Sequence, residues 1–114
     1  MFRKSIILAV FVTACSQGAG KDLQYIKEAR SLAGEWALIN EQARANRLTE
    51  TYVRSMHHWL RDQLQTASSS LTQPNSPGGI ELRTLLAEPA DAPPERLRAH
   101  AQMLKQIEDE LESD

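Results

Sequence analysis

Residues 22–45 read DLQYIKEARSLAGEWALINEQARA, and this stretch decides the fold. Its apolar side chains recur every three or four residues, which places them on one face of an α-helix. The positions on this face are Leu23, Ile26, Ala29, Ala33, Trp36, Asn40 and Ala43, with Leu32 and Ile39 beside them. We therefore expect a helix from about Asp22 to Ala45 with one buried face.

Asn40 is the one polar residue on this face. A buried Asn can fix the register of paired helices at some cost in stability. A small rotation of the helix would instead expose the side chain to water. The sequence leaves both positions open.

A second helix is expected at about residues 49–70. Thr49 can cap its first turn, and Leu48 before the cap can pack on Val53. Its apolar face consists of Tyr52, Val53, Met56, Trp59, Leu60, Leu64, Ala67 and Leu71. Three consecutive serines at 68–70 indicate where this helix fades.

The two helices have similar lengths and a short connection, so we expect an antiparallel hairpin. With the turn centred between Arg47 and Leu48, residues whose numbers add up to about 95 lie at the same level. Trp36 and Trp59 then share one layer, and both belong to the apolar faces. We predict that the two tryptophans pack near each other at the centre of the core.

The rest of the chain also favours helices. The Pro/Gly/Ser-rich segment 73–79 interrupts the helical spacing of apolar residues. We expect a short helix after it, at about 80–87. Further prolines then precede a last helix at about 93–111. Leu97, Leu104 and Leu111 lie seven residues apart on that helix. Its end is strongly acidic, which opposes the helix dipole, so we expect the last turn to fray. The predicted fold is one all-α domain over residues 22–114.

The N-terminal residues have a different composition from the rest of the chain. Arg3 and Lys4 precede a nine-residue apolar run at 6–14, and no further charge occurs until Lys21. A basic start followed by a short apolar run is typical of a secretory signal peptide. A stable transmembrane helix needs ~20 apolar residues, so this run is too short to be one.

The residues Val12-Thr13-Ala14-Cys15 resemble the lipobox of bacterial lipoproteins. The resemblance covers residues 1–15 only and implies that Cys15 receives fatty acyl groups after the peptide 1–14 is removed. Residues 15–21 would then be a lipidated tether, and Ser16 is compatible with sorting to the outer membrane, facing the periplasm. The family prefers Leu where this chain has Val12. The alternatives are an ordinary leader with a chance cysteine, or an uncleaved anchor.

The charge of the predicted mature chain argues against some classes of partner. Removing Arg3 and Lys4 from the 13 basic residues leaves 11, against 15 acidic residues. The resulting formal charge of −4 argues against nucleic-acid binding and against a polybasic membrane patch.

Motifs for catalysis are not evident in the sequence. We find no glycine-rich phosphate loop, Cys-x-x-Cys, His-Glu-x-x-His or Gly-x-Ser-x-Gly pattern. His57 and His58 are adjacent and diverge by ~100° on a helix, so they cannot readily share a metal. His57 borders the apolar face and His58 points outward, so we interpret both as ordinary residues of the helix surface. A metal site shared with His100 is the less favoured hypothesis. We expect no enzyme activity, cofactor or metal.

The function expected from the sequence is that of a membrane-anchored envelope lipoprotein with a protein partner and a structural or interaction role. The aromatic residues could line an interaction surface instead of the core, with Tyr25 the most exposed. These residues are Trp36, Trp59, Tyr52 and Tyr25. The alternative is a lipid-tethered periplasmic carrier of a small ligand, or an enzyme inhibitor.

Overall fold

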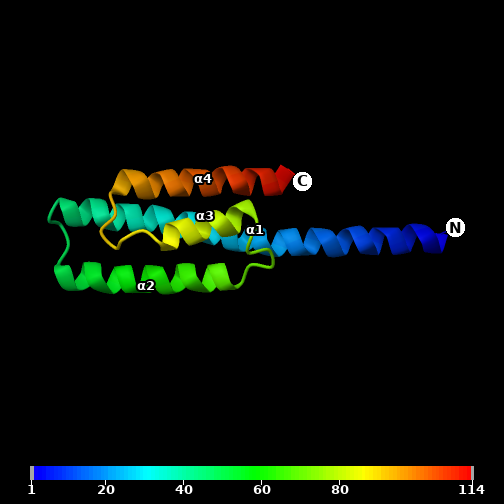
Figure 1. Ribbon diagram of the computed structural model, residues 1–114, viewed down its shortest axis with the longest axis horizontal. Coiled ribbons are helices and arrows are strands. Elements are labelled where there is room, and N and C mark those ends of the chain that lie inside the picture. The colour runs from blue at the N-terminus through cyan, green and yellow to red at the C-terminus, as the bar shows by residue number, and fades with distance from the viewer. Residues whose placement is uncertain (1, 114) are drawn as a thin grey trace.

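The computed structural model describes the backbone of residues 2–113 and the side chains of residues 20–113. Within that part of the chain the structure has four helices and no strand. They are α1 (Phe2–Arg44), α2 (Glu50–Ser69), α3 (Pro77–Leu86) and α4 (Pro94–Ser113), as Figure 1 shows. The prediction of an all-α fold is confirmed.

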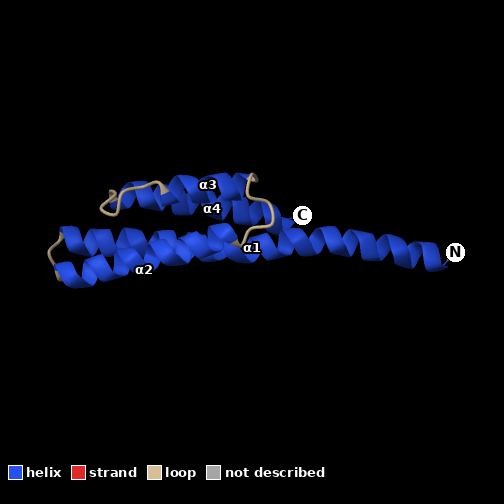
Figure 2. Cartoon of the chain, turned by 60° about the horizontal axis from the view of Figure 1, so that its bottom comes forward, coloured by secondary structure: helices blue, strands red, loops and turns tan. Residues whose placement is uncertain are grey.

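The hairpin of α1 and α2 is formed as predicted, with the two helices antiparallel along most of the bundle (Figure 2). Asn46 adopts a left-handed conformation with φ 59° after the end of α1, which Asn tolerates better than most residues. The Arg47 amide then donates to the Gln42 carbonyl at 3.0 Å. Thr49 caps α2, because its hydroxyl accepts a hydrogen bond from the Tyr52 amide at 3.2 Å.

α1 is the central helix of the bundle. It packs most extensively on α4 and also on α2, while α3 contacts the other three helices (Figures 1 and 2). The core is apolar and comes from all four helices and the loops between them. Its most deeply buried large side chains are Ile26, Leu60, Leu64, Leu82, Leu85, Leu97 and Leu104.

α1 begins at Phe2 instead of at about Asp22. The stretch before Asp22 contains no proline, so nothing there prevents a helix from continuing. Figure 1 shows this part of α1 projecting beyond the other helices, and the molecule measures 68 Å along its longest axis. The predicted start of this helix was therefore wrong, and residues 15–21, expected as a tether, are helical here.

The predicted signal peptide and Cys15 lie where side chains are outside the described structure. Cleavage, lipidation and the resemblance to the lipobox therefore stay predictions. Among the residues that the structure describes, no helix has a stretch long and apolar enough to cross a bilayer.

The last two helices differ from the expected bounds at their ends. α3 starts at Pro77 because the Ser76 hydroxyl caps it, accepting from the Gly79 amide at 3.2 Å. α4 continues to Ser113, whereas its acidic last turn was expected to fray. Lys105 bonds Glu108 and Asp109, and Lys27 lies near Glu112, so basic partners offset the repulsion among these carboxylates.

Candidate functional site

The two tryptophans have different environments, which corrects the predicted centre of the core. Trp36 is buried, and its indole Nε1 donates to the Ala90 carbonyl at 2.8 Å. Trp59 is 45% exposed, whereas its neighbour Leu60 is 1% exposed. Successive helical residues point ~100° apart, so α2 turns Leu60 to the core and Trp59 toward water. The predicted placement of Trp59 at the core centre was wrong.

The two tyrosines also depart from the prediction. Tyr52 was assigned to the apolar face of the second helix but is 47% exposed. Tyr25, expected to be the most exposed of the aromatic residues, is half-buried and packs against the core. The buried residues of α2, Leu60, Leu64 and Ala67, all lie in its C-terminal half.

Exposed aromatic side chains therefore gather on the N-terminal half of α2. Tyr52, half-buried Met56 and Trp59 are spaced four and three residues apart, so they lie on one side of the helix. We call these three residues the α2 aromatic face. It lies beside the core-facing side of α2 and is available for contact.

Asn40 is buried and uses its whole amide group in hydrogen bonds. Its Nδ2 donates to the carbonyls of Ala90 and Ala92 at 3.0 and 2.8 Å. Because both amide hydrogens are used there, the Asn40 Oδ1 accepts from the His57 Nε2 at 2.7 Å. Asn40 thereby joins α1 to α2 and to the segment between α3 and α4. The sequence left open whether the Asn40 side chain is buried or exposed, and in the structure it is buried.

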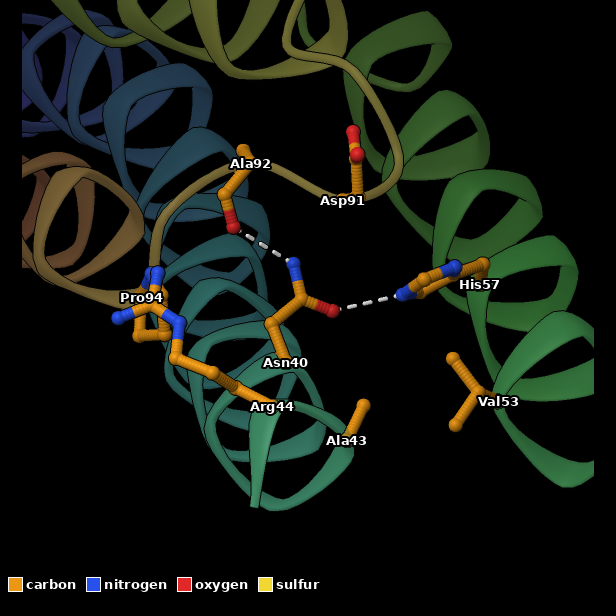
Figure 3. Close-up of a pocket in the computed structure, with 8 residues that line it drawn as sticks. All are labelled: Asn40, Ala43, Arg44, Val53, His57, Asp91, Ala92 and Pro94. Carbon is orange, nitrogen blue, oxygen red and sulfur yellow. Dashed lines mark hydrogen bonds between the residues drawn. The ribbon is translucent and has the colours of Figure 1, made fainter. Parts of the chain in front are cut away.

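An open pocket of about 260 Å³ lies beside this group (Figure 3). His57 borders it from α2, Asn40 and Arg44 from α1, and Asp91 from the loop before α4. Burial lowers the pKa of His57, although the charge of Asp91 acts in the opposite direction. His57 is therefore neutral at pH 7, with the hydrogen on Nε2 and a lone pair on Nδ1.

His100, on α4, lies between two carboxylates. Its Nδ1 is 2.6 Å from the Glu81 Oε1 and its Nε2 is 2.7 Å from the Glu88 Oε2. Arg96 also bonds Glu88 through its Nε, at 3.0 Å from both carboxylate oxygens. Burial disfavours the charge, but the bonds to Glu81 and Glu88 outweigh it and raise the pKa of His100.

The structure does not bring the three histidines together as a metal site. His57 bonds Asn40, His100 bonds the two glutamates, and the exposed His58 lies 3.7 Å from Asp62. Among the described residues, the cluster that could hold a metal ion is formed instead by Glu108, Asp109 and Glu112.

Glu108, in this acidic cluster, is already paired. Its side chain is 4% exposed and accepts from the Arg30 Nε at 2.7 Å and from the Lys105 Nζ at 3.2 Å. Burial opposes the charge, yet the bonds from Lys105 and Arg30 keep the pKa of Glu108 below its ordinary value. The arrangement joins α1 to α4, which explains its charges without an ion.

Sequence patterns identified some of these groups and missed others. His57 was expected to border the apolar face of the second helix, whereas the exposure of Tyr52 and Trp59 was missed because helical spacing placed both on that face. The pairing of His100 with Glu81 and Glu88 was missed, because these residues lie 19 and 12 positions from His100 and on different elements. Comparison of the chain with known protein families, with curated proteins and with solved structures finds no match.

Proposed function

We propose that the chain is a lipid-anchored protein of the cell envelope that acts as a non-enzymatic interaction component. Cys15 would carry the lipid, and the helical bundle would bind a protein partner through the α2 aromatic face. The exposure of Tyr52 and Trp59, at 47% and 45%, is the observation that carries this proposal.

The energetics of the α2 aromatic face favour a protein partner. A Tyr or Trp side chain has about 150–250 Å² of surface to bury. Covering the exposed half of one such side chain would therefore contribute roughly 2–3 kcal/mol to the free energy of binding, for each of the two residues. Both residue types are enriched where interfaces bind most strongly. The core of α2 is already formed by Leu60 and Leu64, so Tyr52 and Trp59 are not needed to fill it.

The position of Cys15 suits a tethered bundle. Asp22, the first buried residue among those whose side chains the structure describes, is seven positions after Cys15. These seven steps along the chain would span ~10 Å as a helix and at most ~25 Å extended. Tyr52 lies near the end of the bundle that is opposite to the projecting part of α1 (Figure 1). A lipid at Cys15 would therefore leave the Tyr52 end facing away from the membrane.

A carrier of a small ligand is less well supported than a docking protein. Among the described residues, an apolar pocket lined in part by Ile26, Ile107 and Leu111 has a volume of about 140 Å³. Pockets for small molecules usually measure ~300–1,000 Å³. Buried apolar side chains from all four helices pack together in the core, while Tyr52 and Trp59 remain exposed on α2.

The anchor is tested by labelling cells with a radioactive fatty acid. The wild-type chain is expected to incorporate the label and to fractionate with outer membranes. Cys15→Ala is expected to lose the label. Equal labelling of the two proteins, or no labelling of either, would refute the anchor.

The docking surface is tested by a photo-crosslinking amino acid placed at Tyr52 or Trp59 in the lipidated protein in its native envelope. We expect both positions to give the same discrete crosslinked species. The same amino acid at Gln102, an exposed position on α4, is the control and should not give it. A species that forms equally from Gln102, or no species from α2, would count against docking through this face.

A further inference from the structure

His100 makes two short contacts with carboxylates inside the bundle. Glu81 contacts its Nδ1 and Glu88 contacts its Nε2, at 2.6 and 2.7 Å. The three side chains are only 12–18% exposed, so water competes little for these groups. We call Glu81, Glu88, Arg96 and His100 the His100 cluster.

These contacts require a charged histidine. A carboxylate oxygen can only accept a hydrogen bond, so each ring nitrogen of His100 must donate one. A neutral imidazole carries one N–H, so one nitrogen would present its lone pair to a carboxylate. Loss of the second proton therefore replaces a strong bond with repulsion at one end of the ring.

The His100 cluster connects two elements that have few other polar links. Glu81 belongs to α3 and Glu88 follows it, whereas Arg96 and His100 are on α4. From α2, Arg61 donates to the carbonyls of Leu86 and Glu88, both at 3.2 Å. α3 has only ten residues, and a helix of that length depends on its packing to persist.

We propose that His100 is a proton-dependent switch that holds α3 and the following loop on α4 when charged and releases them when it becomes neutral. The charged groups that face His100 are Glu81 and Glu88, with Arg96 paired to Glu88 and Arg61 nearby from α2. Because the bonds to these glutamates raise the pKa of His100, release occurs on the alkaline side of the ordinary histidine range. This property belongs to the bundle itself and does not depend on the anchor at Cys15.

Trp36 is placed to report the release. Its indole donates to the Ala90 carbonyl at 2.8 Å, in the loop between α3 and α4. Asn40 holds the same carbonyl at 3.0 Å. When α3 and this loop move away from α4, the Trp36 ring loses its hydrogen bond and meets water, which shifts its fluorescence to longer wavelength.

The experiment uses the full chain in a nonionic detergent, with Trp59→Phe so that Trp36 is the one tryptophan. We expect its emission to shift to longer wavelength between pH 6 and 9.5, with a midpoint above 6.5. The ring protons of His100, followed by NMR, should titrate with the same midpoint. Adding His58→Gln should leave the shift in place, because His58 is exposed on α2, whereas adding His100→Gln should abolish it over this range.

Glu81→Gln provides a second variant if His100→Gln folds poorly. It keeps His100 and Glu88 but removes one carboxylate, so the midpoint should move to lower pH and remain visible. The proposal is overturned if Trp36 emission stays constant while His100 titrates. It is also overturned if His100→Gln retains the same shift, or if Glu81→Gln leaves the midpoint unchanged.

Discussion

Asn40 is the residue where three parts of the bundle meet. Its amide donates to Ala90 and Ala92 in the loop before α4 and accepts from His57 on α2. A neutral side chain with both donors and an acceptor is needed to satisfy these three groups at once. Asn40 therefore holds the far end of the hairpin to the rest of the bundle.

Replacing Asn40 with Ala should destabilise the protein by about 2–3 kcal/mol. The Ala92 carbonyl and the His57 ring would lose a partner at a partly buried site, and unsatisfied polar groups carry costs of this size. Urea unfolding followed by circular dichroism measures the change. Gln24→Ala, at an exposed position of the same helix, should change stability by no more than about 0.5 kcal/mol. Similar values for the two variants would contradict the role given to Asn40.

The sequence could not choose between adjacent residues at the edge of an apolar face. Trp59 and Leu60 both fit the helical spacing of α2, yet Leu60 is buried and Trp59 is not. The rotation of α2 depends on α1 and α3, which cover it from particular directions. Periodicity gives the width of the apolar face, whereas tertiary packing decides which edge meets water.

At the scale of elements, the turn after α2 is fixed to α1 by one carboxylate. The Asp22 Oδ1 accepts from the amide and hydroxyl of Thr72 at 2.8 and 2.9 Å, and its Oδ2 accepts from the Gln73 amide at 3.1 Å. Asp22 is 7% exposed. It had been expected to mark the start of a helix, but in the structure it lies inside α1 and serves the turn.

Asp22→Ala should destabilise the protein by roughly 2–4 kcal/mol, since three hydrogen bonds to a buried carboxylate are lost. The amides of Thr72 and Gln73 should also exchange with deuterium faster than in the wild type, a local effect measured by NMR. Glu28→Ala, at an exposed position of α1, is the control and should change neither quantity. Unchanged exchange at residues 72 and 73 would show that Asp22 does not fix this turn.

The existence of each element was predictable, but the ends of several were not. The segment 73–79 contains prolines and glycines and was interpreted as a break. Its second half, however, contains a cap and a first-turn proline, Ser76 and Pro77, which start α3. Gly78 permits close packing there, because a Cβ at this position would lie 2.5 Å from the Ile26 Cδ1. The same residue types thus both end one helix and begin the next.

At the scale of the whole molecule, α1 packs more extensively on α4 than on its hairpin partner α2. Arg30, Ala33 and Ala37 share one side of α1, and Arg30 bonds Glu108 of α4. The alanines are fully buried, and small side chains let two helices approach closely. The spacing of Leu97, Leu104 and Leu111 predicted an apolar face on α4 but contained no information about which helix it covers.

The ionisable groups of the molecule predict that its stability is greatest near pH 6.5. His100 has a raised pKa, so its contribution is complete below about 6.5 and is lost as the pH rises through its folded value. His57 has a lowered pKa, so its contribution is lost as the pH falls below about 6.5. The bond from His100 lowers the pKa of Glu88, and the pKa of Glu108 is also lowered. The contributions of these two glutamates to stability are lost as the pH falls below about 4.5.

Thermal unfolding of the full chain in nonionic detergent, followed by circular dichroism from pH 3 to 10, should give a bell-shaped profile. His100→Gln should flatten the alkaline side of this profile. The remaining histidine with a shifted pKa is His57, and it changes the stability of the protein only on the acid side. His58→Gln should leave the profile unchanged, since that ring is 82% exposed. A midpoint that keeps rising above pH 7 would mean that the charge of His100 does not stabilise the bundle. An equal effect of His58→Gln would assign the alkaline loss to the net charge of the molecule instead of to the His100 cluster.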